Sequence, residues 1–186
     1  MKISVKDAVL AAARALGVED CIEVYFEGEE SPLGERDAGI LLECFNRIEN
    51  ELALEYLPLI AEEKVNSVTG VIFYSDLAYP ATRILQVEAG DGSQAKYKLF
   101  PDRLETQAGQ VKISYTYAPS EKTMEGEGEY TFAVASKLFL YGMVAEYFLS
   151  AGELENASAW DKKYREALRA ACKTRNVKRM PARRWS

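Results

Sequence analysis

The chain has 186 residues, 48% of them apolar and 28% charged, which is typical of a soluble globular protein with a sizeable core. It carries 23 basic and 29 acidic residues, for a net charge of −6, and contains no histidine. The lack of imidazole excludes Ser–His and Cys–His nucleophile systems and removes the commonest zinc ligand.

The first third of the chain predicts helices. In "SVKDAVLAAARALG" (4–17), Ser4 is suited to cap the start of a helix and Gly17 its end. The segment 18–28 is ambiguous between strand and helix, although its apolar spacing favours helix. A long helix is expected at about 35–57. Its apolar face comprises Leu41, Phe45, Ile48, Leu52 and Tyr56.

The start of the chain also bears on targeting. Residues 7–18 are amphipathic and include Asp7 and Arg14, so they lack the continuous apolar core of a signal peptide. We therefore expect no secretion.

In the middle of the chain the apolar period changes from 3.6 to 2. Apolar and polar residues alternate in "RILQVEA" (83–89), "QAKYKLF" (94–100) and "QVKISYTY" (110–117). "GDG" (90–92) between the first two predicts a hairpin turn. Together with "VTGVIFYS" (68–75), these segments predict four or five antiparallel strands, each with one face buried.

Helical periodicity then returns. Residues 130–150 are apolar on nearly all sides, which predicts a helix at the centre of the helical body. Lys137 and Glu146 interrupt this stretch, which favours a buried helix over a membrane span. A final amphipathic helix, 154–172, should run antiparallel to it, with Asp161 and Arg165 as an exposed pair. Its inward face is expected to be Ala157, Trp160, Tyr164, Leu168 and Ala171.

The predicted fold class is α+β: a helical bundle with a small antiparallel β-module inserted between the major helices, followed by an extended basic C-terminal arm. Residues 1–64 and 121–172 form the two parts of the helical body in this prediction. Residues 65–120 form the β-module, and 173–186 form the arm.

Motifs of common enzymes are missing from the sequence. It contains no GxxxxGK[ST], GxGxxG, GxSxG or HExxH pattern. The cysteines, Cys21, Cys44 and Cys172, are odd in number and widely spaced, so reduced thiols are expected rather than disulfides or a zinc site. We predict no catalytic residue, no metal, no cofactor and no enzymatic activity.

Two groups of carboxylates could be read as catalytic or metal sites, but the sequence favours a structural role for both. Glu43, Glu51 and Glu55 lie at helical spacing around Arg47, which predicts a solvated face paired within itself. A second group alternates with glycine in "TMEGEGEY" (123–130), which favours a flexible acidic loop over a Mg²⁺ site. Its members are Glu125, Glu127 and Glu129.

Glu146 is a separate case, because it lies on an otherwise apolar helix. A buried carboxylate requires a partner, and a lysine or arginine from a neighbouring helix is the expected one.

The C-terminal segment differs in charge from the rest of the chain. Residues 173–186 hold six basic residues and no acidic one, which leaves 17 basic and 29 acidic residues elsewhere. Such asymmetry indicates an interaction segment. Pro181 favours an extended backbone, and arginine and tryptophan are enriched in interface hot spots. The candidate partner-binding residues are Lys178, Arg179, Met180, Pro181, Arg183, Arg184 and Trp185.

Two alternatives for this segment remain open. It could pack back on its own acidic body. It could also contact nucleic-acid phosphates, with Trp185 stacking on a base.

Three segments resemble a known family. "LLECFNRIENELALEYLPL" (41–59), "YGMVAEYFLSAGELENASAWDKKYREAL" (141–168) and "RMPARRW" (179–185) are similar to small structural proteins of tailed phages and prophages, the head-to-tail connector or adaptor proteins. The resemblance covers nearly the whole chain in layout and rests on packing motifs.

The resemblance implies a virion protein that forms a ring of about twelve identical subunits under the portal protein and extends the DNA channel. It further implies docking of the C-terminal arm on the portal, contact with tail or neck proteins, and passage of DNA without sequence-specific binding. The expected location is the virion neck, with host cytoplasm during assembly, and no membrane partner. The alternatives are a tail-completion or terminator protein of the same virion and a small nucleic-acid-binding regulator.

Overall fold

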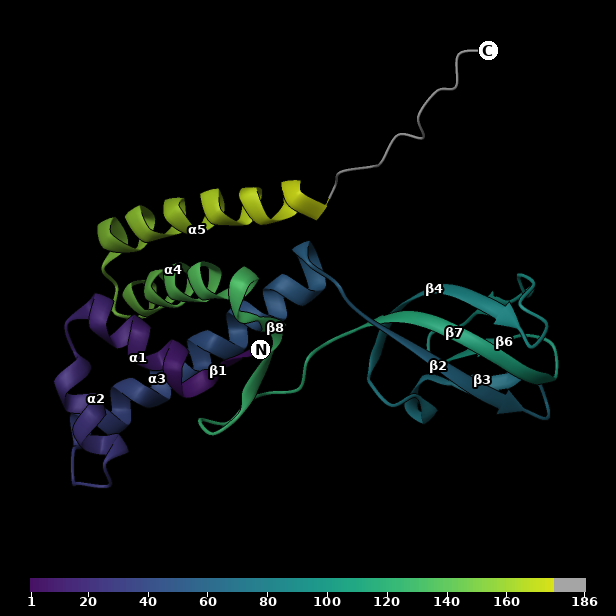
Figure 1. Ribbon diagram of the computed structural model, residues 1–186, viewed down its shortest axis with the longest axis horizontal. Helices are drawn as coiled ribbons and strands as arrows, with labels where there is room; N and C mark the ends of the chain where they lie inside the picture. Colours follow the sequence, from purple (N-terminus) through teal and green to yellow (C-terminus); the bar gives the residue numbers. More distant parts are fainter. Residues whose placement is uncertain (176–186) are drawn as a thin grey trace, which may run out of the picture. The chain divides into compact units, whose positions relative to one another are not determined.

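The structure, a computed structural model, describes residues 1–175. The chain forms two compact units. Among the described residues, the helical unit comprises Met1–Glu49 and 121–175, and the β unit comprises Asn50–Ser120. The fold is therefore α+β, with small antiparallel sheets inserted between helices, as the sequence predicts (Figure 1).

The described residues contain five α-helices, and the inserted sheets lie between the third and the fourth. They are α1 (Val5–Leu16), α2 (Glu19–Phe26), α3 (Pro32–Glu51), α4 (Phe132–Ser150) and α5 (Leu154–Arg175).

Both caps predicted for α1 are confirmed. The Asp7 backbone N–H donates to Ser4 Oγ over 3.3 Å, which satisfies one of the free donors of the first turn. Gly17 has φ 74°, the left-handed conformation that favours glycine at a helix end. The ambiguous segment that follows is helical and forms α2.

α4 lies at the centre of the helical unit, as its sequence predicts. It buries Leu138, Phe139, Met143 and Val144 completely or almost completely. The Phe139 ring stacks on Phe45 of α3, with 4.4 Å between ring centroids. α1 packs on another part of α4.

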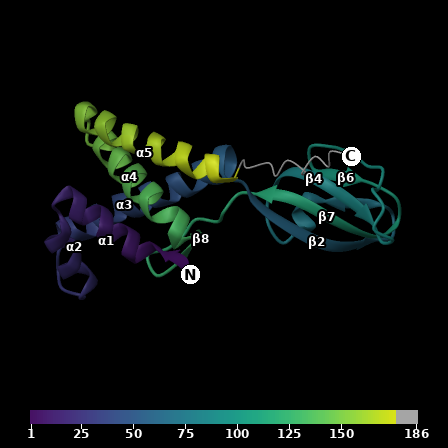
Figure 2. The same ribbon diagram turned by 45° about the horizontal axis from the view of Figure 1, so that its top comes forward.

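α5 runs antiparallel to α4 along its length (Figures 1 and 2). Ala157, Tyr164 and Leu168 are buried on its inner face, and Trp160 and Ala171 are half-buried. The predicted pair on the outer face is confirmed, with 2.7 Å between Arg165 Nε and Asp161 Oδ2.

A two-stranded antiparallel sheet in the helical unit was not predicted. β1 (Lys2–Ser4) pairs with β8 (Glu127–Thr131). The prediction of a flexible acidic loop is therefore wrong for Glu127 and Glu129, which lie in β8. The error arose because β8 pairs with a strand more than 120 residues away, which local glycine content cannot reveal.

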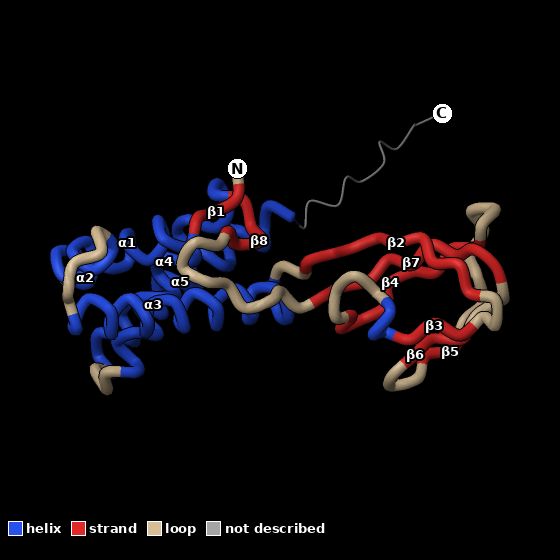
Figure 3. Tube along the Cα trace, turned by 90° about the horizontal axis from the view of Figure 1, so that it is seen from below, coloured by secondary structure: helices blue, strands red, loops and turns tan. Residues whose placement is uncertain are grey.

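The β unit consists of two three-stranded antiparallel sheets (Figure 3). The first has the strand order β2–β7–β4 and the second β3–β6–β5. The strands are β2 (Leu59–Ser67), β3 (Val71–Phe73), β4 (Ala81–Ala89), β5 (Lys98–Leu99), β6 (Arg103–Glu105) and β7 (Gly109–Tyr117).

One apolar core serves both sheets of the β unit. Ile113 and Tyr115 of β7, Val87 of β4, Leu104 of β6 and Ile72 of β3 are buried in it. Successive strand residues face opposite sides, so the alternation in the sequence supplies one apolar face per sheet.

Two details at the start of the β unit differ from the predictions. α3 ends at Glu51, and one π-helical turn (Leu52–Tyr56) follows, so Tyr56 is 41% exposed instead of lying on the inner face. β2 is not predicted as a strand: three consecutive charged residues in "LIAEEKVNS" interrupt the apolar alternation, and in the prediction 59–64 belong to the helical body and 65–67 to the β-module. Its pairing with β7 in fact continues over nine residues.

The predicted hairpin at 90–92 is shorter than expected. Only Glu88 and Gln94 form a bridge across the turn, and β4 pairs with β7 instead. The segment 94–100 contributes only β5, which pairs with β6.

Candidate functional site

The predicted partner-binding residues lie outside the residues that the structure describes. They are Lys178, Arg179, Met180, Pro181, Arg183, Arg184 and Trp185. α5 continues to Arg175, so Lys173–Arg175, the first part of the expected extended arm, is helical.

Glu146 on α4 has the cationic partner that the sequence predicts. Arg47 Nη1 lies 2.7 Å from Glu146 Oε2, which joins α3 to α4. The hydrogen bond and charge of Glu146 raise the pKa of Arg47. The prediction that Arg47 pairs within its own helix is wrong, because its ion pair crosses to α4.

A buried polar cluster that the sequence analysis missed lies where β8 crosses α3. Glu49 is 1% exposed, and its Oε1 accepts the Glu129 backbone N–H over 2.6 Å. Gly128 allows this approach, since a Cβ there would lie 2.9 Å from Glu49 Oε1. Burial raises the pKa of Glu49. The hydrogen bond from the Glu129 N–H lowers this pKa, but by less than burial raises it.

Two lysines complete this cluster. Lys122 Nζ lies 2.6 Å from one Glu129 oxygen, and Lys2 Nζ lies 2.9 Å from the other. Asn46 holds the same loop, accepting the Lys122 N–H over 2.7 Å and donating to the Lys122 carbonyl over 3.1 Å. These contacts bind the returning chain to α3, which is a structural role.

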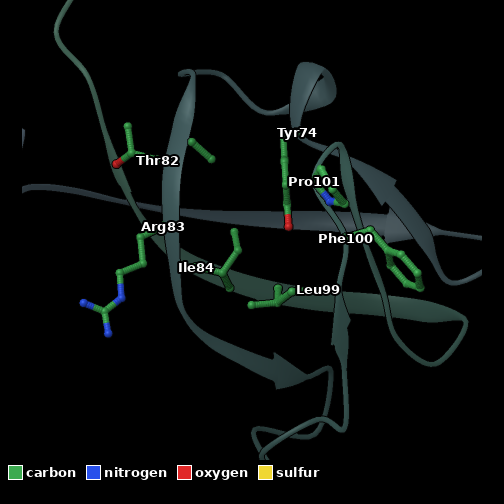
Figure 4. A pocket seen from close by; sticks show the side chains of 8 residues that line it. Tyr74, Thr82, Arg83, Ile84, Leu99, Phe100 and Pro101 are labelled. Atoms are coloured by element: carbon green, nitrogen blue, oxygen red, sulfur yellow. The ribbon is translucent and has the colours of Figure 1, made fainter.

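A pocket of about 290 Å³ opens on one side of the β unit, between β4 and the segment 99–101 (Figure 4). In Figure 4 the Tyr74 hydroxyl points between Ile84 and Leu99, while Arg83 points away from them. Within the described residues, this hydroxyl has no hydrogen-bond partner. Burial and the Asp102 charge raise the pKa of Tyr74, so the phenol stays neutral at ordinary pH. The pocket therefore offers mainly apolar walls and the neutral Tyr74 hydroxyl, with Thr82, whose hydroxyl bonds to Thr116, and Arg83 also in its lining.

This pocket adjoins a sheet edge that is only partly covered. At the C-terminal end of β4, the Ala95 N–H donates to the Val87 carbonyl over 2.9 Å. Within the described residues, the outer edge of 81–86 forms no backbone hydrogen bond beyond the ladder with β7. Free backbone groups beside an apolar pocket form a surface that can accept an extended peptide strand.

Among the described residues, no three His, Cys, Asp or Glu side chains are grouped so that they could hold a metal ion. Across residues 1–175, no helix combines the length and apolarity needed to cross a bilayer.

Comparison with known proteins gives no assignment. No protein-family model matches the chain, and no curated protein matches its sequence.

Proposed function

We propose that this protein is a structural virion protein of a tailed phage, a head-to-tail connector that forms a ring under the portal. In this role it extends the DNA channel and provides the surface on which the tail docks. The proposal assigns the C-terminal arm to the portal, with Arg179, Arg183, Arg184 and Trp185 as its anchors.

The observation that carries this proposal is the organisation of the chain. An antiparallel β unit interrupts a helical unit between α3 and α4, and a basic segment follows α5. Two motifs of the segments that resemble connector proteins lie in packed helices: "YGMVAEY" belongs to α4, and "AWDKKYREAL" belongs to α5.

The distribution of charge also supports the proposal. The body of the chain is acidic, and such a surface does not hold DNA phosphates tightly. A channel for DNA must allow the duplex to slide. The basic residues of the arm, by contrast, can form charge-assisted hydrogen bonds with acidic groups of a partner protein.

The proposal is tested with the portal protein encoded in the same genome. We expect the full chain to form a ring-sized complex with the portal, measured by light scattering, and a chain truncated after Arg175 to lose that complex. Since the truncated chain keeps all of α5 from Leu154 to Arg175, it should keep its helical circular dichroism and its melting temperature. A full-length control with Arg179, Arg183, Arg184 and Trp185 changed to serine should also fail to bind.

The other outcomes are equally informative. Unfolding of the truncated chain would mean that the arm belongs to the core, contrary to the proposal. Absence of portal binding, together with duplex DNA binding that weakens steeply with salt, would instead favour the nucleic-acid-binding regulator. Binding to the tail tube in place of the portal would favour the tail-completion protein.

A further inference from the structure

The β unit has two different open sides. On one side lie the outer edges of β2 and β3, which are adjacent at the turn where Ser67 Oγ donates to the Val71 carbonyl over 2.8 Å. On the other side lie the outer edges of β4 and β5, with the pocket between them (Figure 4). We call these the β2/β3 side and the β4/β5 side.

The strand directions allow the two sides to meet. β2 and β4 are both antiparallel to β7, so they are parallel to each other. When a second copy in the same orientation is placed alongside, its β2 therefore runs parallel to β4 of the first copy. Each sheet can thus continue into the next copy without reversing any strand.

Both sides expose apolar side chains that a neighbour could cover. On the β2/β3 side, Ile60 is 61% exposed and Phe73 44% exposed. On the β4/β5 side, Leu85 is 42% exposed and Leu99 53% exposed. Exposed apolar residues beside an unpaired strand edge mark a site of association.

The charges on the two strand edges are also complementary. Along its solvent face, β4 presents Arg83 and then Glu88, a cation followed by an anion. β2 presents Glu62 and then Lys64, an anion followed by a cation, and of these Glu62 already pairs with Lys112 of β7 over 2.7 Å, so Lys64 is the charge more open to a neighbour. In a parallel arrangement, opposite signs therefore face each other, directly or diagonally, and such cross-strand pairs are favourable.

β2 and β4 differ in how regularly they pair with β7, and this limits how much of the β4 edge is open to a neighbour. β2 pairs with β7 over nine residues without interruption, whereas the pairing of β4 is irregular at two places. Bulges discourage pairing along a whole edge. The free part of β4 is therefore short, 81–86, and the pocket beside it can receive an apolar side chain.

We propose that the β2/β3 side of one copy docks on the β4/β5 side of the next, so that copies associate side by side through a continuous sheet. The occupant of the pocket side is a second copy of this chain. Because the two surfaces differ, the contact is heterologous, and it gives a closed ring when the rotation from one copy to the next divides a full turn. The biological meaning of this contact rests on the proposed connector function, but its physical test does not.

A complementation experiment tests the proposal. Leu99→Arg blocks the β4/β5 side, and Ile60→Arg blocks the β2/β3 side. We expect the wild type to self-associate reversibly at high concentration, seen by light scattering. Each variant alone should associate at least about tenfold more weakly, the effect of losing one moderate hot spot. An equimolar mixture of the two variants should form a dimer and nothing larger, because each variant keeps one intact side.

Controls separate this result from misfolding and from other contacts. Leu154→Arg alters a leucine of the helical unit that is 66% exposed, and it should associate like the wild type. Leu85→Arg and Phe73→Arg form a second pair of blocking variants, in case one of the first pair does not fold. Far-ultraviolet circular dichroism verifies the fold of each variant.

Three results would overturn the proposal: a wild type that stays monomeric at every concentration, blocked variants that associate normally, or a mixture that stays monomeric. A Leu99→Arg variant that still dimerises would indicate a symmetric β2–β2 contact instead. Portal binding is read separately, through truncation after Arg175. Loss of self-association with intact portal binding would contradict this inference alone, and the reverse would contradict the connector function alone.

Discussion

At the scale of single residues, the helical unit keeps the carboxylate of Glu49 almost completely away from solvent. One of its oxygens accepts a backbone N–H from β8, and the other has no partner among the described residues. Burial favours the neutral acid, so the pKa of Glu49 is raised. The folded protein therefore binds a proton more tightly at this position than the unfolded chain does.

This difference predicts a dependence of stability on pH. The Glu49 contribution is fully present below the ordinary pKa of glutamate and is lost as pH rises from about 4.5 to the raised folded value. We expect Glu49→Gln to abolish this loss.

The measurement is urea unfolding at a series of pH values between 4.5 and 8. Glu43→Gln, at an exposed position of the same helix, is the control and should follow the wild-type profile.

The titration of Glu129 falls in a different pH range and does not overlap with that of Glu49. Burial alone would raise the pKa of Glu129, but the hydrogen bonds from Lys122 and Lys2 outweigh burial and lower it. Its contribution is therefore lost as pH falls below about 4.5. A wild-type stability that stays constant above pH 4.5 would contradict the prediction for Glu49.

The Arg47–Glu146 pair supports a second prediction at this scale. The Glu146 side chain is 23% exposed and that of Arg47 is 64% exposed, so solvent weakens their attraction. We expect a coupling of about 0.5–1 kcal/mol in a double-mutant cycle with Arg47→Met and Glu146→Gln. Raising the salt concentration should reduce it. A coupling of zero at low salt would show that the pair contributes nothing to stability.

At the scale of helices and strands, the packing of α4 depends on one glycine. A Cβ on Gly142 would lie 2.7 Å from Ile48 Cδ1 of α3 and 3.2 Å from Tyr164 Cε2 of α5. Gly142 thus allows both neighbouring helices to pack closely on the same turn of α4. This explains the glycine in "YGMVAEY", a motif on which the resemblance to connector proteins partly rests.

Gly142→Ala should destabilise the helical unit by about 1–3 kcal/mol, the usual cost of overpacking a core. Gly39→Ala is the matched control, since Gly39 lies in α3, is exposed, and has nothing within 4 Å of the added Cβ. The control should stabilise the protein by up to about 1 kcal/mol through its better helix propensity. Thermal unfolding of the two variants measures both effects. Equal shifts of the two midpoints would contradict the proposed close packing at Gly142.

At the scale of the whole molecule, the chain leaves the helical unit at α3 and returns to it close by. The two hydrogen bonds between Asn46 and Lys122 join the last turns of α3 to the returning segment. Domains inserted in this way can often be removed, because the two ends of the host lie near each other.

We therefore expect the helical unit to fold without the β-strands of its insertion. Replacing residues 59–118 by a flexible linker of about ten glycine and serine residues should preserve a cooperative melting transition and a helical circular dichroism spectrum. Asn46→Ala in the shortened chain should lower the melting temperature, since it removes the contact with Lys122. A broad, non-cooperative transition in the shortened chain would show that the two units depend on each other for stability.

The sequence by itself determined the features that depend on neighbours along the chain. The periods of 3.6 and 2 placed α1, α4, α5, β4 and β7, and the caps at Ser4 and Gly17 fixed the limits of α1. The order of helices and strands also followed, including the insertion between α3 and α4. These features are local because hydrophobic spacing and capping involve residues only a few positions apart.

Only the tertiary structure decided which distant segments meet. It paired β1 with β8 and β4 with β7, directed Arg47 to Glu146, and buried Glu49 under a strand that the sequence had suggested was a loop. It also brought Ile84 and Leu99 to the two walls of one pocket. Each of these contacts joins residues that are far apart in the chain, and the energy that selects them comes from burial and pairing in three dimensions. The spacing of apolar residues within one segment does not specify which distant segment it will pair with.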